Sequence, residues 1–221
     1  SYHNYRDVDI QSYVLAAETL ADRGCYVLRM GAVVHEPINS SHHMVIDYAT
    51  HDLRSDFMDI YLGAKCTFCI SCGTGFDAIP LIFRRPVVFV NHVPIGYLFT
   101  FQNYTLGLTK RHFSVIKNRE LTLKEIVQSD LCVALRSSDY ESKHVKLFDN
   151  TPEEVRDIVV EMDERLKGTW EQSDDDEALH QIFWDIFPTD VLDTNQQRPL
   201  HGTIKSRFGA NFLRNNRFWL Q

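Results

Sequence analysis

The chain has 221 residues, of which 44% are hydrophobic, and this is enough apolar material for the core of one large domain or two small ones. Its 30 acidic and 23 basic residues give a formal charge of −7, which argues against a nonspecific nucleic-acid binder. The sequence contains no apolar run near the roughly 20 residues of a membrane span, and no signal peptide. Its five cysteines follow no disulfide-like pattern, which favours a reducing cytoplasm.

The first 50 residues indicate a helix followed by a strand. Apolar residues recur at helical spacing between positions 10 and 21, and Gly24 ends the helix. Residues 25–30 form a predicted strand with Arg29 at its carboxyl end. A loop rich in His, Ser and Asn separates this strand from a short apolar segment at 45–49.

The next stretch repeats the alternation of helix and strand. Phe57, Ile60 and Tyr61 mark a helix that runs directly into the following strand. After that helix come a buried strand at 66–71, a turn of small residues at 72–75, an apolar helix at 76–83 and a second strand at 86–90. Continuous apolar strands are typical of a parallel sheet covered on both faces. The pattern predicts an α/β fold with a Rossmann-like, doubly wound parallel sheet and flanking helices.

The turn at 72–75 has the features of an anion site. Gly73 and Gly75 let backbone amides approach a ligand closely, and Thr74 adds a hydroxyl. These amides would lie at a helix N-terminus, where unpaired N–H groups favour an anion. The alternative is a tight connection without a ligand. The turn lacks the ATPase phosphate loop and the dinucleotide fingerprint, which makes simple NTPase and NAD functions weak hypotheses.

A metal site is not expected. Cys66, Cys69 and Cys72 are three residues apart, but Phe76 occupies the place of the fourth cysteine in a ferredoxin-type run. Side chains alternate along a strand, so Cys69 would point away from the other two. Buried core cysteines account better for the pattern. The pair His42 and His43 lacks partners at metal-ligand spacing, so no metal or other cofactor is predicted.

The second half of the chain is mainly helical. Residues 92–119 show no clean period and predict a long excursion beside the site. Lys110 and His112 within it could reach a phosphate, although surface groups are the simpler interpretation. Capping boxes begin helices at Thr122 and Thr151, with a brief strand at 145–148 between them.

The chain is predicted to form one domain over residues 1–221. Within it, the tail at 199–221 is expected to form a last helix that packs its Phe and Trp residues back on the domain. The abrupt start indicates the C-terminal part of a longer protein.

A series of short motifs in fixed order carries a family resemblance. They are Arg-Met-Gly at 29–31, Ile-Asp-Tyr-Ala at 46–49, Arg-Ser-Asp-Phe-Met-Asp-Ile-Tyr-Leu at 54–62, Cys-Gly-Thr-Gly at 72–75, Arg-Pro-Val-Val-Phe-Val-Asn at 85–91, Leu-Thr-Leu-Lys-Glu-Ile at 121–126, Asn-Thr-Pro-Glu-Glu at 150–154, Glu-Met-x-x-Arg at 161–165, Gly-Thr-Trp at 168–170 and Leu-His-Gly at 200–202. Together they resemble a family of bacterial glycosyltransferases associated with surface-polysaccharide genes. The resemblance covers nearly the whole chain. It implies the C-terminal, donor-binding half of a GT-B-type enzyme.

The resemblance implies transfer of a sugar from a nucleotide-diphosphate donor to a glycan or lipid-linked glycan acceptor. It implies a cytoplasmic protein, free or peripheral to the inner membrane, that binds no nucleic acid and has no transmembrane segment in this chain. The catalytic base is expected in an N-terminal half outside this chain. Alternative functions are a nucleotide-sugar epimerase, a noncatalytic nucleotide- or glycan-binding module and a nonsugar phosphotransferase.

The predicted donor site has several parts, each with a structural alternative. The residues assigned to donor and diphosphate are Arg29, Gly31, Ser71, Gly73, Thr74, Gly75, Phe76 and Asn91. The alternative for Arg29 is an ion pair with Asp47 or Asp56, and that for Asn91 is turn formation. Asp47 and Tyr48 are candidates for ribose or base contacts, although Asp47 could equally cap the next helix. Asp56, which shares a helix face with Asp59, could orient a sugar hydroxyl or Arg29.

Overall fold

The apolar run before Asn91 forms the centre of a parallel sheet. The structure is a computed structural model that describes residues 4–191 and 199–221. Its strands are β1 (Val27–Leu28), β2 (Val45–Ile46), β3 (Cys69–Ser71), β4 (Val87–Phe89), β5 (Thr105–Gly107), β6 (Arg111–Ser114), β7 (Arg119–Glu120), β8 (Val145–Phe148) and β9 (Arg207–Phe208). Its helices are α1 (Val14–Asp22), α2 (Asp56–Lys65), α3 (Ala78–Ile82), α4 (Leu123–Gln128), α5 (Ser137–Ser142), α6 (Pro152–Lys167), α7 (Asp176–Ile186) and α8 (Ala210–Asn215).

Four strands form the main sheet in the order β3-β4-β5-β9, and every neighbouring pair is parallel. All three residues of β4 are fully buried, as expected for a parallel strand with both faces covered. Parallel strands direct their carboxyl ends to one edge, so the segments after β3, β4 and β5 meet there. The predicted mixed α/β fold with a parallel sheet and flanking helices is confirmed at this level.

Three parts of the sheet topology differ from the expectation. β1 and β2 pair only with each other, in a separate parallel sheet. The excursion at 92–119 contains β5, a strand of the main sheet, and β6, which pairs antiparallel with β7 and β8. The tail contributes β9. These strands have two to four residues, too few for a periodic pattern, and they depend on pairing with distant segments.

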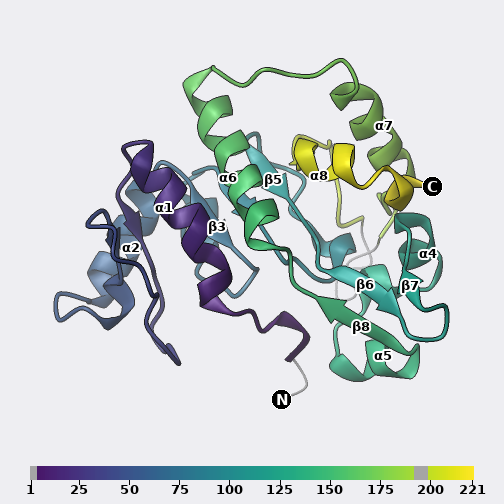
Figure 1. The fold of residues 1–221 in the computed structure, drawn as a ribbon, viewed down its shortest axis with the longest axis horizontal. Helices are drawn as coiled ribbons and strands as arrows, with labels where there is room; N and C mark the ends of the chain where they lie inside the picture. The colour runs from purple at the N-terminus through teal and green to yellow at the C-terminus, as the bar shows by residue number, and fades with distance from the viewer. Residues whose placement is uncertain (1–3, 192–198) are drawn as a thin grey trace.

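Helix α6 covers the main sheet and begins as the sequence predicts. Thr151 and Glu154 form a complete capping box, and Gly168 ends the helix at φ 72°. Its apolar stripe is buried and contacts β4 and β5. Figure 1 shows α1 lying beside α6 across the same side of the sheet. The capping box predicted at Thr122 is also present, at the start of α4.

The buried face of α2 differs from the prediction. Phe57, Ile60 and Tyr61 are exposed, whereas Gly63 faces α3 and is buried. A Cβ on Gly63 would lie 2.8 Å from Ile79 Cγ2, so α2 approaches α3 closely through this glycine. A pattern based on large apolar side chains does not detect helix packing through a small residue. This is why the sequence did not predict the buried face of α2.

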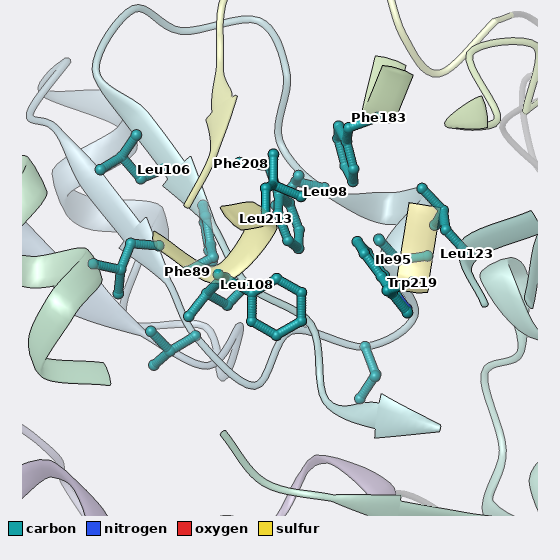
Figure 2. Packing of buried hydrophobic residues seen from close by; sticks show 14 of the residues in the cluster. Phe89, Ile95, Leu98, Leu106, Leu108, Leu123, Phe183, Phe208, Leu213 and Trp219 are labelled. Carbon is teal, nitrogen blue, oxygen red and sulfur yellow. The ribbon is translucent and has the colours of Figure 1, made fainter. Parts of the chain in front are cut away.

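The tail packs back on the domain through aromatic rings. Figure 2 shows Phe208 beside Phe183 of α7, and the two ring centroids are 4.4 Å apart. Trp219 lies 5.4 Å from Phe208 on the same centroid measure and is also buried. Such pairs contribute about 0.5–1.5 kcal/mol beyond the burial of their area. The tail, which forms β9, α8 and a last 3-10 turn, thus contacts the domain through Phe208 and Trp219, whereas Phe218 is half-exposed.

Candidate functional site

The predicted strand, turn and helix around Thr74 are present at the carboxyl end of β3. Gly73 has φ 82° and Gly75 has φ 102°, a region that favours glycine. A Cβ on Gly73 would also lie 3.2 Å from His92 Nδ1, a tight contact to which the ring would have to yield, and the backbone conformation itself disfavours a side chain. The turn therefore brings its backbone directly onto His92.

Two of the three turn amides are already hydrogen bonded. Gly73 N donates to Ser71 Oγ at 3.0 Å, and Gly75 N donates to Asp77 Oδ1 at 2.8 Å. Within the described residues the amide of Thr74 has no such partner, and Thr74 is exposed. The buried Asp77 carboxylate beside Gly75 would repel an anion at that end. A ligand phosphate thus fits best against Thr74, and helix α3, with only five residues, adds little dipole.

His92 is a buried polar group beneath this turn. Neither ring nitrogen has a hydrogen-bond partner among the described residues, and the ring packs edge-on against Phe89. Burial lowers the pKa of His92 to about 4, outweighing the Tyr97 backbone and the Asp77 carboxylate, which favour the charged form. His92 is therefore a neutral imidazole near the Tyr97 backbone, and neither of its nitrogens makes a hydrogen bond of regular geometry with a described residue. An unused buried polar group costs about 1–3 kcal/mol, a penalty that a ligand can relieve.

Asn91 connects the carboxyl ends of two strands to the start of α6. Its backbone amide donates to Asn150 Oδ1 at 2.7 Å, and its Oδ1 accepts from Asn150 N at 2.5 Å. Asn150 Nδ2 donates to Thr109 O beyond β5, and Asn91 Nδ2 reaches Tyr13 Oη at 3.4 Å. Asn91 has φ 54° and is fully buried. Its structural alternative, turn formation, is thus supported, and its side chain is engaged within the protein.

Lys110 and His112 are buried, so their interpretation as surface groups is wrong. Lys110 Nζ lies 2.8 Å from Asp149 Oδ1 and donates to the Asp7 carbonyl at 2.6 Å. Its charge also acts on Cys72 in the turn: burial raises the pKa of that thiol, while the Thr74 hydroxyl and Lys110 oppose the rise. Lys110 therefore lies near the turn with its charge paired to Asp149. Lys110 lies in the short connection between β5 and β6, and both strands are too short to be recognised from the sequence.

Arg29 is held by its structural partner. Arg29 Nη1 lies 3.1 Å from Asp47 Oδ1, and Nη2 donates to the Glu36 carbonyl. The second Asp47 oxygen accepts from Ile38 N, so this carboxylate fixes the loop after β1 and does not cap the next turn. Gly31 in that loop has φ 146°, and a Cβ there would meet Val34. The ion pair that was one of the alternatives for Arg29 is present.

The other predicted contacts lie around α2. Tyr48 is buried, and its hydroxyl accepts from Ser55 N at 3.1 Å, so its ring is not open to a base. Asp56 is exposed in the first turn of α2, whereas Asp59 pairs with Arg54 at 2.7 Å. Phe76 packs toward α2, near Gly63. The structure thus brings Ser71, Gly73, Thr74, Gly75 and Asn91 together at one sheet edge.

Sequence reasoning did not assign His92, Tyr13 or Asn150 to this edge. Tyr13 contacts Asn91 and lies near Cys72, and burial raises the pKa of its hydroxyl. These residues meet through contacts between segments as far as 78 positions apart. The one local signal was the position of His92, two residues after the strand at 86–90, which pairs with the strand that leads into the glycine turn.

Searches against protein-family profiles, curated proteins and solved structures found no match for this chain. None of the helices in the described ranges is both long and apolar enough to cross a membrane. All five cysteines are free thiols. The geometry at the sheet edge and the motif resemblance are therefore the grounds for a function.

Proposed function

We propose that this chain is a Rossmann-like, GT-B-type donor domain of a glycosyltransferase that moves a sugar from a nucleotide diphosphate to a surface-glycan acceptor. The observation that carries the proposal is the glycine turn after β3, backed by the unpartnered His92 and flanked by the buried Lys110. Ligands of open α/β sheets bind at the carboxyl ends of the strands, which is where these groups meet. The ordered motifs that carry the family resemblance support the same reaction class.

The proposed chemistry needs stabilisation of a departing diphosphate. The bond between the anomeric carbon and the terminal phosphate oxygen breaks, its electron pair stays on that oxygen, and the acceptor oxygen bonds to carbon. The Thr74 amide and hydroxyl would donate hydrogen bonds to the phosphate, and Lys110 would contribute positive charge. The neutral His92 would hold the turn or a ligand oxygen through its N–H. None of these residues is assigned as the base that takes the acceptor proton.

Calorimetric titration with UDP, GDP, CDP, ADP and their sugar conjugates tests the donor site. We expect saturable binding of one nucleotide, weakened about fivefold in Thr74→Ala, because that change removes one hydrogen bond to phosphate. Thr67→Ala is the matched control, since this exposed threonine precedes β3 at its opposite end. Absence of binding by every nucleotide, or equal affinity in Thr74→Ala and the parent, would contradict the assignment.

Turnover separates the alternatives. A glycosyltransferase releases nucleoside diphosphate only when an acceptor is present, whereas an epimerase converts the nucleotide sugar without one. A binding module shows affinity without turnover, and a phosphotransferase moves phosphate and leaves the sugar in place. We expect acceptor-dependent release when the protein is assayed with glycan acceptors.

A further inference from the structure

A cavity lies at the edge of the main sheet opposite the glycine turn. Its volume is about 480 Å³. It opens between the amino ends of β5 and β9 and the last turns of α6, whereas the glycine turn lies at the carboxyl ends of the strands. We call it the amino-edge cavity and define it by Tyr104, Thr105, Arg165, Trp170, Lys205 and Arg207.

The amino-edge cavity is positively charged in an acidic chain. Three of its lining residues are basic, and among the described residues that line it none is Asp or Glu. Arg165 pairs with the buried Glu161 behind it, and Arg207 pairs with the exposed Glu177. Lys205 is exposed and makes no ion pair with any described residue. This arrangement leaves one unpaired cation and two guanidinium groups facing the same space, which favours an anionic ligand.

Two polar atoms at the cavity are buried without partners. Thr105 is 1% exposed, and its hydroxyl has no hydrogen bond within the part of the chain that the structure describes. The Trp170 indole N–H is likewise buried and has no hydrogen-bond partner among the described residues. Buried polar groups are nearly always satisfied, so these two leave hydrogen bonds open to a bound molecule or to ordered water. Both can donate, which matches the acceptor oxygens of an anion.

The rim of the cavity carries an aromatic ring held in a strained position. Tyr104 is 56% exposed and has φ 59°, a left-handed conformation that costs a bulky residue of order 1–3 kcal/mol. The Tyr104 carbonyl accepts from Val87 N, so β4 holds this conformation in place. An exposed flat ring beside three basic side chains suits a ligand with both a ring and a negative charge.

The carboxyl end of α6 acts against an anion here, but weakly. Its dipole places about half a negative charge at this end. The amides of Gly168 and Thr169 already bond the carbonyls of Arg165 and Glu164, which reduces that effect. The full charges of the basic side chains outweigh it.

We infer that the amino-edge cavity binds a small phosphorylated ligand that also carries a ring, either a sugar phosphate or a nucleotide. The inference rests on residues separate from the glycine turn and does not depend on the proposed transferase activity. Calorimetric titration with inorganic pyrophosphate, a hexose 1-phosphate and a nucleoside monophosphate tests it. We expect one of the two phosphate esters, the hexose 1-phosphate or the nucleoside monophosphate, to bind saturably and more tightly than pyrophosphate. The ester with the higher affinity shows whether the ring belongs to a sugar or to a nucleoside.

Two variants locate this binding. Lys205→Ala removes the unpaired cation and should weaken binding about tenfold. Thr105→Val removes the buried hydroxyl at nearly constant shape and should weaken binding about fivefold, while the thermal midpoint of the ligand-free chain stays equal or rises. Lys143→Ala, which changes an exposed lysine at the C-terminal end of α5, is the matched control. It should bind the ester with the same affinity as the parent.

Thr74→Ala distinguishes the two sites. Binding in the amino-edge cavity should be unchanged in Thr74→Ala and reduced in Lys205→Ala. Binding at the donor site should be reduced in Thr74→Ala and unchanged in Lys205→Ala. The inference is wrong if no ester binds, if pyrophosphate binds as tightly as both esters, or if affinity is the same in Lys205→Ala, Thr105→Val and the parent. A loss of stability in Thr105→Val would also contradict it, because that result would give the hydroxyl a structural partner.

Discussion

At the scale of single residues, the turn combines groups that favour and oppose an anion. Thr74 offers a free amide, whereas Asp77 occupies the neighbouring amide of Gly75 with a carboxylate. A buried carboxylate stabilises the turn, but its charge would act on any phosphate placed there. The balance between these two effects can be measured because one substitution changes the charge alone.

We expect Asp77→Asn to tighten binding of the nucleotide diphosphate about tenfold, since the amide oxygen can still accept from Gly75 N while the like charge disappears. Calorimetry of parent and variant at low and high salt gives the comparison. Asp174→Asn changes an exposed carboxylate of the loop before α7 and should leave affinity unaltered. Equal or weaker binding in Asp77→Asn would show that phosphate does not lie at this turn.

At the scale of elements, the sequence predicted correctly those helix ends and turns that depend on residues close together in the chain. The capping boxes at Thr122 and Thr151 and the strand, turn and helix around Thr74 are present because caps and glycine turns act within a few residues. The pairing of Asn91 with Asn150 and the strands β5 and β9 escaped prediction. Their cause is contact between distant segments, which no local pattern contains.

The packing of α2 on α3 gives a prediction at this scale. Gly63→Ala raises helix propensity, but the new methyl would lie 2.8 Å from Ile79 Cγ2, a branched side chain with little freedom to move. We expect a net loss of about 1 kcal/mol in the free energy of unfolding, because overpacking exceeds the gain. Denaturant titration measures it. Gly202→Ala, where a Cβ meets no atom within 4 Å, is the control and should be nearly neutral. A stabilised Gly63→Ala protein would mean that α2 and α3 separate readily.

At the scale of the whole molecule, the core contains several neutral histidines. Burial lowers the pKa values of His92, His112 and His180 to about 4 each. His92 lies under the glycine turn, His112 lies on β6, and His180 lies on α7, so the three are spread over the domain. Each must remain unprotonated in the folded state, because its surroundings do not compensate for a buried charge.

This arrangement predicts acid sensitivity in a defined window. A histidine with a lowered folded pKa binds more protons when unfolded, so its stabilising effect is complete above pH 6.5 and declines as pH falls toward 4. The slope is at most about 1.4 kcal/mol per pH unit for each histidine. Paired carboxylates such as Glu177, whose pKa is lowered chiefly by Arg207, lose their contribution only below their ordinary pKa near 4.5. Between pH 6.5 and 4.5 the histidines therefore dominate the decline.

We expect His92→Leu to reduce the slope of unfolding free energy against pH by up to about 1.4 kcal/mol per pH unit, since it removes one of the four histidines, His201 among them, whose pKa burial lowers. Urea titrations at half-unit intervals from pH 7 to 4.5 measure the slope. Glu161, whose pKa burial raises, titrates with the opposite sign but is common to both proteins and cancels in the comparison. His35→Leu, at an exposed position, should keep the parent slope. A parent slope in His92→Leu would mean that His92 has the same pKa in the folded and unfolded chains, and the lowered pKa beneath the turn would have to be abandoned.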